Sequence, residues 1–385
     1  MTDKQTIFVS DLKFREISRD ASSKIKYALV AKEAVHPLTD VTMLDGIRLA
    51  PVSGDALGVG EVWDKHCFGL FAPGRDVPEV AVYVKLLCLP EQDGKVVNAS
   101  LPGDISKILN DPVAPVEKPN TAIFYTITNT AINADGRPDP SHPVQVQRGD
   151  VSPAEYLIRQ VSEHFLRDQG IRNFSTLSPL RSGIRNSAQG FEIWLSEAIK
   201  NPSTILTLSE QKKLKQFASS LAREGDPDSL SPGQLLNIVR QRYAHLNEDG
   251  KIFVTKIMKD LGMYYLASEK TVSGHNGVSL VRDKVANFHL SNGAMIAKIH
   301  WAPPGITTPS ETVGGGGLMA SYRYEPEHLA ERKTAYKTEG VIAAEPKLQQ
   351  EYTLKINGLK LPSAQIDGAT VQVSPTASSA VARRF

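Results

Sequence analysis

The fold class is decided by TAIFYTITNTAI at residues 121–132, whose continuous apolar stretch, rich in β-branched and aromatic residues, predicts a central strand. A loop follows over 133–149, where Pro, Gly and Asp are frequent. A helix then begins, because Ser152 is a candidate N-cap, Pro153 suits the first helical position and Glu155 lies three residues after the cap. The apolar face of this helix consists of Leu157, Ile158, Val161, Phe165 and Leu166.

Strands and helices are also predicted on both sides of this region. Strands are expected in 66–89 around the turn PGRD, in FSTLSP at 174–179, and in 285–301 and 318–324. Helices are expected over 14–35, over 101–109 and, as four segments, over 191–268. We therefore predict an α/β or α+β fold, with a helical insert around 195–268 between two halves of a sheet. One domain is expected over 1–345, followed by an extension over 346–385 that frays at its end.

The composition of the 385 residues is that of an ordinary soluble protein, with 41% hydrophobic and 22% charged residues. A formal net charge of +2 gives no global field for nucleic acid or a membrane. Cys67 and Cys88 lack metal-ligand spacing and are expected to be inert thiols. The N-terminal residues have no apolar signal core, and no stretch reaches the roughly 20 apolar residues of a membrane helix. A cytoplasmic enzyme or binding protein is expected.

Two features of the central segment could carry chemistry. A strand that leads into a helix N-terminus can bind an anion, and Arg148 and Gly149 lie just before that helix. The alternative is an ordinary capped helix after a surface loop. Ser178 ends a strand directly before Pro179, so its hydroxyl could act as a nucleophile or donate a hydrogen bond to an oxyanion. The alternative is a turn serine, and the absence of a GxSxG motif argues against ordinary esterase chemistry.

A histidine in NFHLSNG, residues 287–293, is the third feature. In a strand, His289 would face away from Phe288 and Leu290 and lie among Asn287, Ser291 and Asn292, as suits a general acid or base. A purely structural histidine has the same pattern. The glycines at 314–317 could allow a close backbone approach or form a flexible loop.

Several segments together resemble malonyl-CoA decarboxylase, in the order of that family and over about residues 10–330. The two most specific are FSTLSP at 174–179 and VANFHLSNGA at 285–294. The others are EAVHP at 33–37, GDIS at 103–106, AIFYTI at 122–127, QRG with YLIRQV around 147–161, WL at 194–195, YYL at 264–266 and GLMASYRY at 317–324.

The resemblance implies a GNAT-type acetyltransferase fold, in which a mixed sheet flanked by helices holds coenzyme A in a central cleft. It implies Ser178 and His289 as the catalytic pair and places the phosphate loop at Gly149 to Glu155. Substrate contacts are assigned to Ser175, Arg148, Gly149, Val151, Ser152, Asn287, Asn292 and Tyr322. The partner is then an acyl-CoA substrate, with no metal, no cofactor beyond the CoA moiety of the substrate, no nucleic acid and no membrane. Assembly into a homo-oligomer is left open.

The sequence also departs from that family. Only about thirty residues precede EAVHP, so the helical domain that normally comes first is expected to be absent. The phosphate loop reads RGDVSPAE and is poorer in glycine, and RSGIRNSAQ is inserted after the LSP motif. Decarboxylation of malonyl-CoA is the first hypothesis. An acyltransferase acting on an amine or a carrier thiol, and a non-catalytic acyl-CoA binder, are the alternatives.

Overall fold

The computed structural model describes residues 5–16, 65–75, 78–92, 95–96, 118–129, 144–147, 151–180, 190–221, 229–272, 277–303, 317–358, 366–367 and 370–371. The chain forms two compact units, Met1–Leu177 and Ser178–Phe385. The fold is mixed α/β, as the sequence predicts, and its largest sheet is a mixed sheet of seven strands. None of the helices in the described ranges has the length and apolarity needed to cross a bilayer.

Unit 1 is built mainly from strands. Its elements are β1 (Gln5–Phe8), η1 (Val9–Asp11), β2 (Lys13–Glu16), β3 (Lys65–Phe71), β4 (Pro78–Leu87), β5 (Glu91–Gln92), β6 (Lys95–Val96), β7 (Thr121–Asn129), β8 (Val144–Gln147), α3 (Pro153–Gln169) and most of β9 (Asn173–Pro179). The larger strands lie in the order β9-β7-β4-β3-β2, and β9 runs parallel to β7. Every residue of β4 is buried, which explains its nearly continuous apolar sequence.

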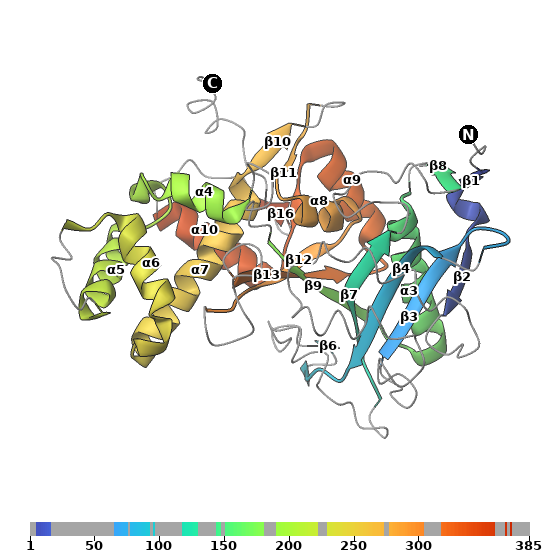
Figure 1. The fold of residues 1–385 in the computed structure, drawn as a ribbon, viewed down its shortest axis with the longest axis horizontal. Helices are drawn as coiled ribbons and strands as arrows, with labels where there is room; N and C mark the ends of the chain where they lie inside the picture. Colours follow the sequence, from blue (N-terminus) through green and yellow to red (C-terminus); the bar gives the residue numbers. More distant parts are fainter. Residues whose placement is uncertain are drawn as a thin grey trace. The chain divides into compact units, whose positions relative to one another are not determined.

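Helix α3 lies against β3 and β4 of this unit (Figure 1). Its Phe165 ring packs edge-on against Phe68 of β3, with ring centroids 5.4 Å apart. The helix begins as predicted, because the Ser152 hydroxyl oxygen accepts the Glu155 N–H at 3.1 Å. It ends at Gly170, whose φ of +70° is a conformation that suits glycine.

Unit 2 is richer in helices. Its elements are α4 (Phe191–Ala198), η3 (Pro202–Thr204), α5 (Leu208–Leu221), α6 (Pro232–Gln241), η5 (Tyr243–His245), α7 (Glu248–Ser268), β10 (Lys270–Val272), β11 (Ser279–Val281), α8 (Lys284–Ser291), β12 (Met295–Trp301), β13 (Leu318–Tyr324), α9 (Leu329–Glu339), β14 (Ile342–Ala343), α10 (Pro346–Gly358), β15 (Ile366–Asp367) and β16 (Thr370–Val371). Figure 1 shows α5, α6 and α7 gathered together, which is the predicted helical insert.

The antiparallel strands β12 and β13 of unit 2 pack against α7. A methyl group added at Gly262 of α7 would lie only 3.1–3.2 Å from side-chain atoms of Leu318 and Ile299. The glycine therefore lets the longest helix of the described chain approach the two strands closely. The opposite end of α7 is capped by Asn247, whose side chain accepts the Gly250 N–H.

Three secondary-structure predictions are wrong where the structure describes them. Residues 14–16, expected in a helix, belong to β2, which pairs with β3. Residues 144–147, expected in a loop, form β8, which pairs in parallel with β1. The expected strand over 285–301 is a helix, α8, followed by β12. Local composition misled the first two predictions, because both segments are strands through pairing with distant residues.

The other predicted strands and helices are confirmed where the structure describes them. The remainder of 14–35, the segment 101–109, most of 133–149 and 181–190, residues 314–316 and the last residues of the chain lie outside the described ranges. Cys67 is buried, Cys88 is half-buried, and neither forms a disulfide.

Candidate active site

Ser178 is held by the strand that ends at Pro179. All seven residues of β9 are buried, and Ser178 itself is 7% exposed. After the proline the chain remains hydrogen-bonded to β13, because the Leu180 N–H donates to the Leu318 carbonyl at 3.1 Å. The hydroxyl oxygen of Ser178 lies 3.0 Å from Nε2 of His289. The two residues that the sequence singles out as a catalytic pair therefore meet in a buried hydrogen bond, 111 positions apart in sequence.

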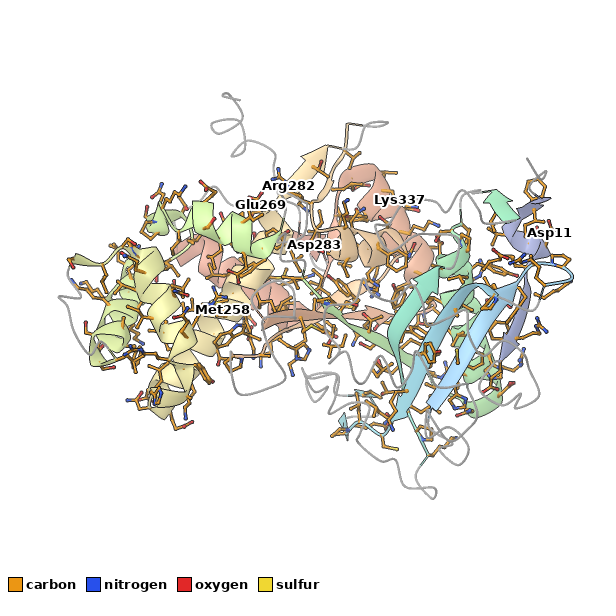
Figure 2. The ribbon with its side chains drawn as sticks, viewed as in Figure 1. Asp11, Met258, Glu269, Arg282, Asp283 and Lys337 are labelled. Carbon is orange, nitrogen blue, oxygen red and sulfur yellow. The ribbon has the colours of Figure 1, made fainter. Side chains whose placement is uncertain are left out.

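His289 comes from helix α8 and not from a strand. The side chain of Asp283, labelled just before α8 in Figure 2, accepts the N–H groups of Val285 and Ala286, both at 3.0 Å. This cap starts a helix of eight residues whose last turn carries His289. The helix ends before Gly293, whose φ is +84°. The prediction that His289 alternates with its neighbours along a strand is therefore wrong, because the residue lies in a helix. His289 is 5% exposed.

Two tyrosines of β13 fix the imidazole. The Tyr324 hydroxyl lies 2.7 Å from Nδ1, and the Tyr322 ring stacks on the imidazole with centroids 4.4 Å apart at 21°. Their spacing of two places both on one face of the strand. Tyr322, predicted to bind substrate, thus serves as a platform for the histidine. Burial, with a further contribution from the charge of Asp283, raises the pKa of Tyr322 well above its usual value, so this phenol remains neutral.

The hydrogen bonds at both ring nitrogens define what the histidine can do. A neutral imidazole with its proton on Nδ1 donates to Tyr324 and accepts from the Ser178 hydroxyl through Nε2. An imidazolium donates from both nitrogens, and Tyr324 and Ser178 can each accept. The arrangement Tyr324–His289–Ser178 can therefore hold a proton at Nε2 or remove one from Ser178. Sequence reasoning missed Tyr324, and the alternation in SYRY was the available signal.

The two predicted asparagines of α8 have different surroundings. The side-chain oxygen of Asn287 accepts the Tyr336 hydroxyl at 2.8 Å, and that hydroxyl accepts the Val281 N–H at 2.9 Å. Asn287 thus ties α8 to α9 and β11. Asn292 is 8% exposed, and its amide nitrogen has no hydrogen-bond partner among the residues that the structure describes. The oxygen of Asn287 is therefore used in a bond that supports the fold, whereas the amide nitrogen of Asn292 can still donate a hydrogen bond to a ligand.

The other predicted binding residues belong to unit 1, and two of them lie outside the described residues. Ser175 lies three positions before Ser178 in β9, so the alternation of side chains places it on the opposite face of the strand. Ser152 and Val151 precede α3 in unit 1, and the Ser152 hydroxyl oxygen caps that helix. Arg148 and Gly149 lie outside the described residues. A phosphate site at this helix start therefore stays a prediction.

Among the described residues, metal-binding side chains do not form a cluster. Within the described part of the chain, no three His, Cys, Asp or Glu side chains come together in a group that could hold a metal ion. The chemistry that the described residues offer is hydrogen bonding and proton transfer in a buried setting, where hydrogen bonds to a developing charge are stronger than in water.

Known proteins are similar to this chain in sequence and in fold. A family model described as "Malonyl-CoA decarboxylase C-terminal domain" matches residues 11–362. Mitochondrial malonyl-CoA decarboxylase of Anser anser anser is 28% identical over 259 residues, and that of Rattus norvegicus is 26% identical over 260. These alignments cover 64% and 63% of this chain, and the chain spans 44% of the length of each relative.

Solved structures agree on the fold. The crystal structure of malonyl-CoA decarboxylase from Rhodopseudomonas palustris matches with a TM-score of 0.56 at 23% identity, and that from Agrobacterium vitis matches with a TM-score of 0.55 at 23% identity. Each match covers 89% of this chain and 67% of the other.

Proposed function

Since the chain belongs to the malonyl-CoA decarboxylase family, a family of carboxy-lyases, we propose that it converts malonyl-CoA, or a related acyl-CoA thioester, to acetyl-CoA and CO2. The observation that carries this proposal is the buried 3.0 Å contact between the Ser178 hydroxyl and Nε2 of His289. The substrate supplies its own electron sink, because the thioester carbonyl can hold the electron pair that CO2 leaves behind.

The reaction breaks one carbon–carbon bond and consumes one proton. The bond between the carboxylate and the α-carbon breaks, CO2 departs, and its electron pair forms a thioester enolate. Ser178 donates a hydrogen bond to the thioester oxygen as negative charge develops there. His289, as an imidazolium, transfers its Nε2 proton to the α-carbon and becomes neutral, while its Nδ1–H keeps donating to the Tyr324 hydroxyl oxygen. Solvent then returns one proton to the imidazole.

Binding of the CoA moiety is proposed for the start of α3. The first N–H groups of a helix lack intrahelical partners and its dipole favours an anion. Arg148, Gly149, Val151 and Ser152 are the residues that would hold the phosphates. Oligomeric state and cytoplasmic location stay predictions; the relatives compared above carry mitochondrial names.

The test is turnover of malonyl-CoA by purified protein, with CO2 and acetyl-CoA measured by mass spectrometry. Ser178→Ala and His289→Ala should each lower kcat by about 100- to 1000-fold, the usual scale of deleting one oxyanion donor or one general acid. The matched controls are Ser196→Ala and His328→Ala, since both side chains are exposed and lie outside this hydrogen-bond network. Near-wild-type turnover in either site variant would exclude the proposed roles.

The same assay separates the alternatives. Release of CO2 without any acceptor supports decarboxylation, whereas a product that forms only after an amine or a carrier-protein thiol is added supports acyl transfer. Calorimetry with CoA adds a third measurement. A chain that binds CoA but turns over no acyl-CoA is a binding protein, and a chain that does not bind CoA contradicts all three hypotheses.

A further inference from the structure

One buried donor beside the catalytic pair has no partner. The amide nitrogen Nδ2 of Asn292 is enclosed, and within the described ranges nothing accepts its hydrogen bonds. Leaving a buried donor unpaired is costly, so such a group in a folded protein requires an explanation. One explanation is a ligand that supplies the missing acceptor.

Two other enclosed asparagine amides of the described chain, those of Asn173 and Asn120, are bonded. The amide nitrogen of Asn173 donates to the Thr121 hydroxyl at 2.9 Å, and that of Asn120 donates to the Leu89 carbonyl at 2.8 Å. The chain therefore satisfies amide donors where they hold the fold together. The amide nitrogen of Asn292 lacks such a bond among the described residues, and Asn292 follows His289 by only three positions.

The backbone fixes where Asn292 can lie. It follows His289 by three residues, a spacing that places two side chains next to each other on a helix surface. Its N–H and that of Ala294 both donate to the His289 carbonyl at 3.1 Å. The next residue, Gly293, approaches the Leu329 carbonyl so closely that an added Cβ would lie 2.2 Å from the oxygen. The amide is thus held one helical turn from the imidazole.

We infer that Asn292 is a third catalytic residue, whose amide donates a hydrogen bond to the thioester oxygen of the acyl-CoA together with Ser178. This inference rests on the proposed decarboxylation. A donor directed at the carboxylate would stabilise the charge that the reaction removes and would slow it. A donor directed at the thioester oxygen acts where charge accumulates, so its hydrogen bond is stronger in the transition state than in the bound substrate.

The test is Asn292→Leu, which has similar size and no donor. The backbone of Asn292 has φ −99° and ψ 10°, which leucine can adopt. We expect kcat to fall by about 100- to 1000-fold, while calorimetric affinity for acetyl-CoA, whose thioester carries no developing charge, changes by less than about threefold. We also expect the melting temperature to be unchanged or higher, because an unpaired buried donor is removed. Loss of activity without loss of stability distinguishes this role from a structural one.

Asn292→Asp provides the second variant, since it keeps the shape and replaces the donor with an acceptor. The kcat of Asn292→Asp should be no higher than that of Asn292→Leu. Asn173→Leu is the matched control: it breaks a bond that supports the fold, so it should lower the melting temperature and leave the rate per folded molecule unchanged. Turnover within about fivefold of wild type in either Asn292 variant, or failure of both to fold, would overturn the inference. A wild-type protein that releases no CO2 would instead contradict the proposed function.

Discussion

Replacing Lys270 with methionine should stabilise the protein, and most strongly at neutral and acidic pH. The ammonium group lies at the start of β10, is buried, and has no hydrogen-bond partner within the described residues. Burial lowers the pKa of Lys270 from 10.5 to about 7. Methionine keeps a flexible apolar chain of similar length in the same place and removes the ionisable group.

The magnitude follows from the displaced pKa. Between pH 7 and 10.5 the unfolded chain holds a proton on Lys270 that the folded chain releases, so the free energy of unfolding rises with pH in this window. A shift of about 3.5 units at about 1.4 kcal/mol per unit gives an upper bound of about 5 kcal/mol. The difference between Lys270→Met and wild type should therefore be largest at pH 7 and below, and should vanish toward pH 10.5.

Urea unfolding at pH 6, 7, 8 and 9, followed by circular dichroism, measures this difference directly. Lys213→Met is the control, because that side chain is exposed on α5 and its amine stays in water in both states. The control should change stability equally at every pH. A Lys270→Met variant that is less stable than wild type at pH 7, or whose difference from wild type does not depend on pH, would refute the reasoning.

Two further predictions concern other buried groups of unit 2. Tyr324→Phe removes the hydroxyl that lies 2.7 Å from Nδ1 of His289, and should lower kcat by about 10- to 100-fold with little change in KM; an unchanged kcat would exclude a role for this hydrogen bond. Burial, with the nearby Lys298 and Lys259, lowers the pKa of His300 to about 3. Only the unfolded chain then takes up this proton as pH falls from 6.5 to 3, so stability is lost in that window. His300→Gln should therefore lose less stability than wild type between pH 7 and 4 in urea unfolding, and equal losses would contradict this.

Helix α3 was predictable from sequence because its determinants are local. The cap at Ser152, the proline after it and the apolar stripe all lie within one segment, and each appears in the structure as expected. Helix α8 was not predictable in this way. It spans only eight residues and contains β-branched and aromatic side chains that are also common in strands. Its cap, Asp283, was a local signal that the strand prediction overlooked, and its end depends on the distant backbone of Leu329.

Ser178 and His289 were singled out from sequence through resemblance to a family, whereas the contacts that support them could not be predicted in that way. Tyr324 lies 35 residues after His289, and Tyr336 lies 49 residues after Asn287. A pattern such as the alternation in SYRY can mark Tyr324, but it does not indicate which distant residue it contacts, since that follows from the packing of β13 and α9 against α8. For the same reason Asn287 was assigned to substrate, although its oxygen accepts a bond from Tyr336. Sequence indicated which polar residues matter, whereas packing decides which of them are already satisfied.

A series of backbone and side-chain contacts leads from the buried lysine to the helix that carries His289. Lys270 lies opposite Val281 in the β10–β11 pair, the Val281 N–H donates to Tyr336, and Tyr336 donates to Asn287 in the helix that carries His289. Protonation of Lys270 adds an unpaired charge at the first member of this series. Because both imidazole nitrogens and one ring face are held by β9 and β13, a displacement of α8 would strain these contacts. Because burial lowers the pKa of Lys270 to about 7, we expect its protonation in the neutral range to weaken the β10–β11 hairpin and, through Tyr336, the contacts that hold α8.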